Sequence, residues 1–129
     1  MDGLELKIAL INYEDGNVLE AIRLLNKIID KCLKNDNLFC RDPFWKILAK
    51  QVFCAVVLNE FYNKREINNN DLLVMFSDFE SIKLKVKEFC LNFGGVNSIN
   101  FIPYLRGSSD KMIESAISII NDNIINYLQ

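Results

Sequence analysis

Cysteine thiols and paired carboxylates are the residue types in this sequence that could carry chemistry. None of the 129 residues is histidine, which excludes Ser-His and Cys-His nucleophile pairs, histidine-ligated zinc and imidazole acid–base catalysis. The two adjacent carboxylates, Glu14 and Asp15, precede a glycine, where a solvated turn is favoured over a general acid and base. We therefore predict no catalytic residue in the chain.

The four cysteines are predicted to be free thiols. They contain no C-x-x-C pair and match no zinc-finger spacing. Three of them fall within apolar helical patterns, where a reduced thiol behaves as a small hydrophobic group. The sequence thus predicts no metal site and a cytoplasmic location. The cysteines are Cys32, Cys40, Cys54 and Cys90.

Cofactor and membrane signals are also absent from the sequence. It has no G-x-x-x-x-G-K-[ST] loop and no G-x-G-x-x-G turn, so it lacks a standard cradle for nucleotide phosphates. Lysine and arginine total 15 against 17 acidic residues, which gives no overall attraction to nucleic acid or anionic lipid. The apolar run from Val52 to Leu58 is far shorter than the roughly 20 residues that span a bilayer. We predict a domain that is not an enzyme, has no cofactor and makes no direct membrane contact.

Helices are expected to position the remaining candidate residues. After a turn at 14–16, apolar residues repeat at helical spacing over about 17–34. The pair Asp42-Pro43 predicts the start of a second helix, about 43–63, whose middle is apolar on all sides and must be covered by other helices. Residues 4–13 begin with alternating apolar and polar positions, which favours a short strand or extended segment.

Capping residues predict three more helices in the second half of the chain. The first covers about 72–76 after Asn70 or Asp71, the second ends near 93, and the last ends near 128. Without a linker or an internal repeat, residues 1–129 are predicted to form one domain. The predicted fold is all-α, a compact bundle of about five helices around the helix at 43–63.

The connector at 95–107 is the first candidate for partner binding. It is unusually apolar for a loop, and it must pack down or meet a partner. We select Phe101, Tyr104 and Arg106 because aromatic residues and arginine are common interface anchors. The alternative is that Phe101 and Tyr104 only seal the helices beneath them. For the aromatic residues Phe44, Trp45 and Phe53, core packing is favoured over a ligand-binding role.

A second candidate surface is the lysine face of the helix that ends near 93. Lys83 and Lys87 are four residues apart and share one face, where they could contact DNA. A solvated helix face is the simpler interpretation, since nucleic-acid surfaces usually carry a larger basic cluster.

Two stretches of the sequence resemble a known family. Asp42-Pro43-Phe44-Trp45, followed by a long apolar helix, is similar to a D-P-F-W segment of the TraG/TraD-like coupling ATPases of type IV secretion and conjugation. The stretch from Asp110 to Ile117 resembles the G-K-T-L-x-S-I-L stretch that follows in that family, with Asp110 and Met112 in place of its glycine and threonine.

This resemblance implies an all-alpha domain inserted between the nucleotide-binding motifs of a larger, membrane-anchored ATPase. The implied function is recognition of relaxases, accessory factors or protein effectors for DNA and protein transfer, with single-stranded DNA as a further ligand. The rest of the coupling ATPase would be a constant partner. The alternative hypothesis is a stand-alone helical interaction or oligomerisation module from a plasmid or phage.

Overall fold

A computed structural model describes residues 4–33, 43–64, 66–92 and 103–128, apart from the side chains at 92, 103, 106 and 125–128. Every regular element in these ranges is a helix, which confirms the predicted all-α bundle. The helices are α1 (Leu4–Glu14), α2 (Val18–Cys32), α3 (Pro43–Lys64), α4 (Asn69–Ser77), α5 (Phe79–Asn92), α7 (Pro103–Gly107) and α8 (Asp110–Leu128).

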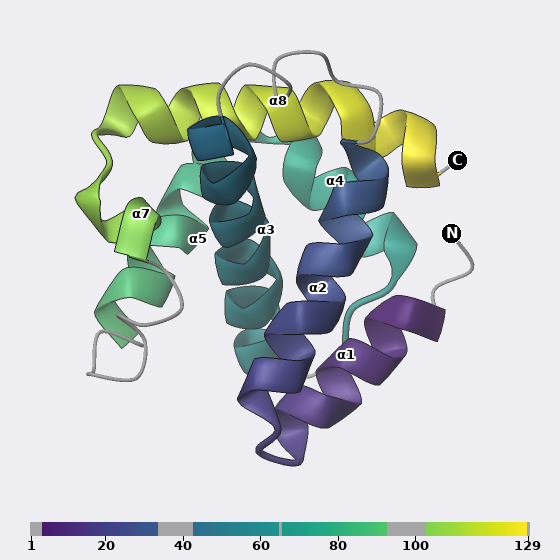
Figure 1. Cartoon of the computed structure of the whole chain (residues 1–129). Helices are drawn as coiled ribbons and strands as arrows, with labels where there is room; N and C mark the ends of the chain where they lie inside the picture. Colours follow the sequence, from purple (N-terminus) through teal and green to yellow (C-terminus); the bar gives the residue numbers. More distant parts are fainter. Residues whose placement is uncertain (1–3, 34–42, 65, 93–102, 129) are drawn as a thin grey trace.

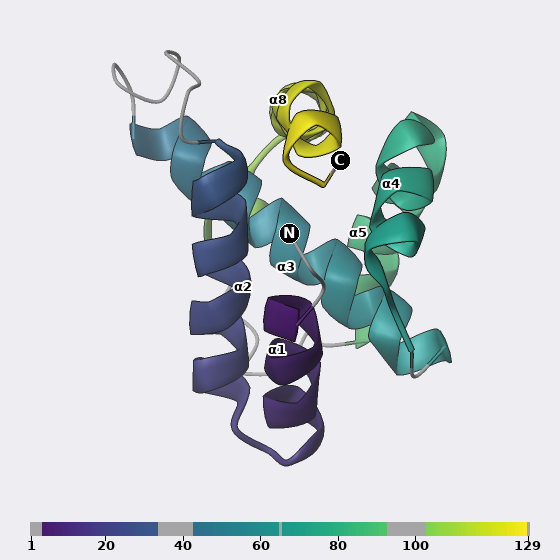
Figure 2. The same cartoon turned by 90° about the vertical axis from the view of Figure 1, so that its right-hand side faces the viewer.

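Helix α3 is the central element, as its apolar sequence predicts. All residues from Val52 to Phe61 are buried, including the polar pair Asn59 and Glu60. The helix lies between the α1–α2 hairpin on one side and α4 and α5 on the other, and α8 crosses one end of the bundle (Figures 1 and 2). A helix that is apolar on all faces is stable only when it is covered in this way.

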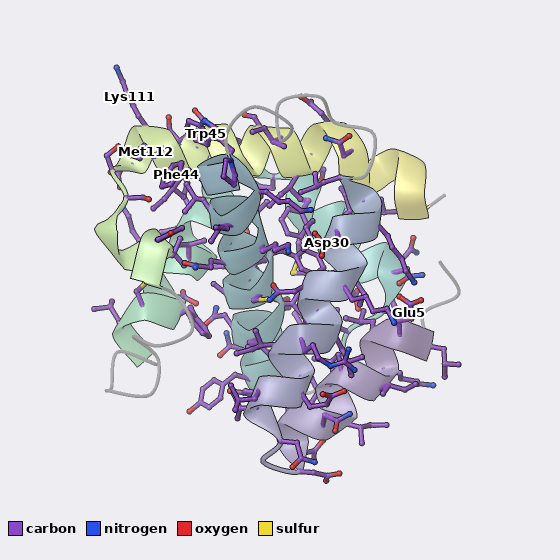
Figure 3. The ribbon with its side chains drawn as sticks, viewed as in Figure 1. Glu5, Asp30, Phe44, Trp45, Lys111 and Met112 are labelled. Atoms are coloured by element: carbon purple, nitrogen blue, oxygen red, sulfur yellow. The ribbon has the colours of Figure 1, made fainter. Side chains whose placement is uncertain are left out.

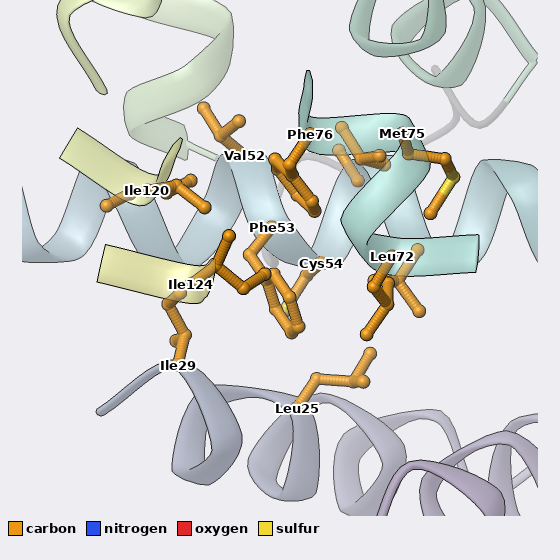
Figure 4. Close-up of a cluster of buried hydrophobic side chains, with 14 of the residues drawn as sticks. Leu25, Ile29, Val52, Phe53, Cys54, Leu72, Met75, Phe76, Ile120 and Ile124 are labelled. Atoms are coloured by element: carbon orange, nitrogen blue, oxygen red, sulfur yellow. The ribbon is translucent and has the colours of Figure 1, made fainter. Parts of the chain in front are cut away.

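The core forms where α2, α4 and α8 converge on the middle of α3. Phe53 is fully buried, and its ring stacks on Phe76 of α4 with centroids 5.8 Å apart. Figure 4 shows labelled side chains of α2, α4 and α8 around this pair. The surrounding residues include Leu25, Ile29, Leu72, Met75, Ile120 and Ile124.

The predicted N-terminal strand is wrong, because residues 4–14 form helix α1. Its buried residues Leu6, Ala9 and Leu10 follow helical spacing and lie in the core. Further apolar residues lie on the opposite face of the helix. Apolar and polar residues therefore alternate at the start of this segment, as they would in a strand. Packing against α2 decides in favour of the helix.

The α1–α2 turn depends on one glycine. Gly16 has φ +89°, a left-handed conformation that residues with a Cβ rarely adopt. Its neighbour Asn17 donates its backbone N–H to the carbonyl of Asn12 at 2.8 Å and starts α2. The turn predicted from Glu14-Asp15-Gly16 is therefore confirmed.

Helix α4 starts earlier than predicted. Asn68, not Asn70 or Asp71, is its N-cap: the Asn68 side chain accepts from the Asp71 backbone N–H at 2.9 Å. The Asp71 carboxylate in turn accepts from the Asn68 N–H at 3.0 Å, which completes a capping box. Three consecutive asparagines offer equivalent caps in the sequence, and only this reciprocal pair distinguishes them.

The end of the predicted connector is also helical. Residues 103–107 form α7, so together with α1 the structure exceeds the predicted number of about five helices. Leu105 of α7 is buried, and its N–H donates to Gln51 Oε1 of α3 at 2.8 Å. The long-range cap from Gln51 could not be inferred from local sequence.

Candidate partner-binding surface

Three aromatic rings from α3 and α7 form the aromatic cluster, which consists of Phe44, Trp45 and Tyr104. The Phe44 and Trp45 rings meet edge to face with centroids 5.3 Å apart, and the Phe44 and Tyr104 centroids are 5.7 Å apart. Phe44 and Trp45 are only partly buried, and Tyr104 is 41% exposed. In Figure 3, Phe44 and Trp45 lie at the corner where both α3 and α8 begin. Aromatic side chains that remain accessible in this way are typical interface anchors.

Helix α7 holds Tyr104 in place against the start of α3. The Leu105 contacts to the core and to Gln51 fix one side of this short helix. The Ser108 hydroxyl donates to the Tyr104 carbonyl at 2.6 Å and closes its other end. Tyr104 is therefore presented from a fixed backbone, which lowers the entropy lost when a partner binds.

A groove borders the aromatic cluster on the side of α8. It has a volume of about 380 Å³ and is lined by Trp45, Ser115, Ser118 and Ile119. Ser115 and Ser118 are exposed, while Ile119 is largely buried. We call this hollow the Trp45 groove. Its mixture of an indole ring, two hydroxyls and an aliphatic floor is suited to an apolar side chain of a partner protein.

The predicted partner-binding residues are only partly described. Phe101 lies outside the described residues, and so does the Arg106 side chain, although the Arg106 backbone belongs to α7. Tyr104 is exposed, as a binding role requires.

For Phe44, Trp45 and Phe53 the sequence predicts core packing. The prediction is confirmed for Phe53, whereas Phe44 and Trp45 pack against the core but also reach the surface. Their position in the first turn of an otherwise apolar helix is the signal that could have indicated this.

The predicted DNA-contact lysines do not form a basic patch. The Lys83 Nζ lies 2.8 Å from Glu114 Oε1 of α8 and 4.0 Å from Glu80 Oε1. The hydrogen bond to Glu114 raises the pKa of Lys83 and fixes its charge beside carboxylates. Lys87 is exposed and makes no ion pair with another described residue. Because Lys83 is paired with a carboxylate, the two lysines together offer little net positive charge to a phosphate backbone.

Cys32 and Cys54 are free thiols that are strongly protected by burial. Burial raises the pKa of both Cys32 and Cys54 to about 12. The Cys54 thiol also donates to Asn26 Oδ1 at 3.4 Å. Within the described ranges, no three Cys, Asp or Glu residues are grouped so as to hold a metal ion. Cys40 lies outside the described residues.

We expect Cys32 and Cys54 to resist alkylation by iodoacetamide at pH 8 and to react only after unfolding. The thiolate is the reactive form, and a pKa of about 12 keeps both groups protonated in the folded state. Unfolded thiols ionise near pH ~8.5, so above that pH the unfolded state binds fewer protons than the folded state does. The free energy of unfolding therefore falls as the pH rises toward about 12. Mass spectrometry of alkylated peptides, with and without denaturant, measures the protection. Modification of Cys54 in the folded protein would contradict it.

Comparison of the chain with protein-family models, with curated proteins and with solved structures yields no match. No helix in the described part of the chain combines the length and apolar character needed to cross a bilayer. The surface itself and the sequence resemblance are therefore the features of the chain that bear on its function.

Proposed function

We propose that this domain binds protein partners through the aromatic cluster and the Trp45 groove. The observation that carries the proposal is three neighbouring, partly exposed aromatic rings beside a groove of about 380 Å³. In the context of the sequence resemblance, the domain is a cytoplasmic recognition domain of a TraG/TraD-like coupling protein. Its partners are then relaxases, accessory factors or effectors, together with the remainder of the ATPase.

Two features of the chain support this context. Phe44 and Trp45 of the D-P-F-W segment belong to the aromatic cluster, so the stretch that carries the resemblance also contributes to the proposed surface. The first turn of α1 and the last turn of α8 lie on the same side of the bundle in both views (Figures 1 and 2). A domain inserted into a host chain requires such an arrangement, because both ends must rejoin the host.

The test is a binding assay of the purified domain against relaxase and accessory proteins of conjugative elements. The variant Ser118→Arg places a long side chain in the Trp45 groove from an exposed position, and Tyr104→Ser removes one exposed ring. We expect each to weaken binding about tenfold or more while the domain remains folded. Ser77→Arg, at the exposed end of α4, is the matched control and should retain affinity.

Two results would count against the proposal. Equal binding by Ser118→Arg and Ser77→Arg would remove the Trp45 groove from the interface. Tight binding of single-stranded DNA that falls steeply with salt and depends on Lys83 and Lys87 would instead place the function on α5.

A second candidate function, self-association, is favoured by the outer face of α1. Leu4, Ile8 and Ile11 are 57%, 42% and 55% exposed and follow one another at helical spacing. A stand-alone oligomerisation module would bury such a stripe against a second copy. Sedimentation velocity over a range of concentrations tests this: a dimer that dissociates in Ile8→Lys supports the module, and a monomeric wild type rejects it.

A further inference from the structure

A second cavity, separate from the Trp45 groove, lies between α2 and α3. Its volume is about 230 Å³, and we call it the α2–α3 cavity. This is below the roughly 300–1,000 Å³ of typical small-molecule sites and is suited to one inserted side chain. It is lined by Ile22, Asn26, Ile47, Lys50, Gln51 and Cys54.

Two side-chain amides in this cavity have their oxygens occupied. Asn26 Oδ1 accepts from the Cys54 thiol at 3.4 Å, and Gln51 Oε1 accepts from the Leu105 N–H at 2.8 Å. Neither NH₂ group hydrogen-bonds to a described residue. The groups that Asn26 and Gln51 can still offer to a bound molecule are therefore hydrogen-bond donors.

The charged residues beside the cavity also favour a ligand that accepts hydrogen bonds. Lys50 Nζ lies 3.0 Å from Asp30 Oδ1, and Lys46 Nζ lies 3.2 Å from the same oxygen. Because two ammonium groups share one carboxylate, this group carries a net charge of +1. Ammonium and amide donors together select an anionic acceptor, since hydrogen bonds to an ionised acceptor are the stronger ones.

From this arrangement we propose that the α2–α3 cavity binds a carboxylate on a short apolar stem, such as a glutamate side chain. The NH₂ groups of Asn26 and Gln51 and the Lys50 ammonium hold the carboxylate, and Ile22 and Ile47 contact the methylene groups. Resting on the proposed protein-binding function, this site gives the partner a chemical character: it presents an acidic side chain to the α2–α3 cavity as well as an apolar side chain to the Trp45 groove. A free dicarboxylate has the same chemistry and is distinguished by the test.

The experiment follows the side-chain NH₂ signals of Asn26 and Gln51 by two-dimensional nitrogen–proton NMR. Three probes are titrated: a blocked Leu-Glu-Leu tripeptide, its Leu-Gln-Leu twin, and glutarate. We expect the glutamate tripeptide to shift both signals and the glutamine twin to leave them unchanged. If glutarate binds as tightly as the tripeptide, the carboxylate site is supported with a free dicarboxylate as its ligand.

Two nearly isosteric variants test the donors without disturbing the fold. Gln51→Glu and Asn26→Asp keep the oxygen that accepts from Leu105 and Cys54 but replace the NH₂ donor with an anionic oxygen. Each should weaken tripeptide binding about tenfold or more. Asn70→Asp, an exposed position on α4, makes the same charge change and should bind as the wild type does.

The proposal is overturned if no probe shifts the two NH₂ signals, or if the glutamine twin shifts them as much as the glutamate tripeptide does. The partner assay described above gives an independent answer. A partner that binds with Ser118→Arg sensitivity but is indifferent to Gln51→Glu would retain the proposed function and reject the α2–α3 cavity as its second contact.

Discussion

Replacing Phe53 with alanine should destabilise the domain by about 3–5 kcal/mol, the usual cost of removing a buried phenylalanine. The side chain is fully buried, stacks on Phe76 and lies where α2, α4 and α8 meet α3 (Figure 4). A domain of ordinary stability, about 5–15 kcal/mol, would lose about a fifth or more of its free energy of unfolding. Chemical denaturation with circular dichroism measures the change.

Val74→Ala is the control for the Phe53 variant. Val74 lies on α4, as Phe76 does, but is 69% exposed, so its truncation should change the free energy of unfolding by less than about 0.5 kcal/mol. Phe53→Leu retains most of the buried volume and should have an intermediate effect. If Phe53→Ala and Val74→Ala unfold at the same denaturant concentration, the assignment of Phe53 to the centre of the core is wrong.

The elements of this fold were predictable where hydrophobic periodicity and capping agreed. The continuous apolar run in α3 predicted a buried central helix, and α5 begins after Asp78, a residue type typical of helix caps, whose carboxylate accepts from the Ser81 N–H. The prediction failed at α1, because a short helix with apolar residues on both faces mimics strand alternation. It failed again at α7, whose first turn depends on Gln51, more than fifty positions away.

The candidate site was harder to predict than the fold. Tyr104 was selected for its residue type in an apolar connector, and the structure leaves it exposed beside Phe44. Whether Phe44 and Trp45 belong to the exposed aromatic cluster depends on how far α7 and α8 cover the start of α3. That coverage is a property of the tertiary structure and cannot be seen in the local sequence. In the α2–α3 cavity, the oxygens of Asn26 and Gln51 are occupied by contacts with residues distant in the sequence, which leaves the NH₂ groups as the available donors. The residue types alone do not predict this.

The contact between α3 and α5 differs from the rest of the interior because it is partly polar. Glu60 of α3 has a side chain only 6% exposed, and it lies 2.7 Å from Lys64 Nζ and 3.6 Å from Lys85 Nζ of α5. The hydrogen bond to Glu60 raises the pKa of Lys64. Beside them, the buried Asn59 donates to Glu88 Oε2 at 3.0 Å. Polar pairs at fixed positions restrict how α5 can slide or rotate along α3, which an apolar surface alone would permit.

Lys85→Met should therefore destabilise the domain by about 1.5–3 kcal/mol, although methionine retains most of the apolar stem. Removing one partner of a buried ion pair typically costs about 3–5 kcal/mol because the other charge is left unpaired. Here Lys64 still neutralises part of the Glu60 charge, which reduces the expected loss. The variant also lacks the hydrogen bond that Lys85 Nζ donates to Ser81 Oγ at 2.9 Å in the wild type. Urea denaturation gives the difference in free energy of unfolding.

The double variant Glu60→Gln/Lys85→Met separates an unpaired charge from a general loss of packing. If the cost arises from the buried Glu60 carboxylate, neutralising it should make the double variant more stable than Lys85→Met alone. Lys87→Met, two positions along α5 at an exposed site, should change stability by less than about 0.5 kcal/mol. A double variant less stable than Lys85→Met would show that Glu60 stabilises the contact through groups other than Lys85. In that case Lys64 alone would satisfy the carboxylate, and the α3–α5 register would depend on Asn59 and Glu88.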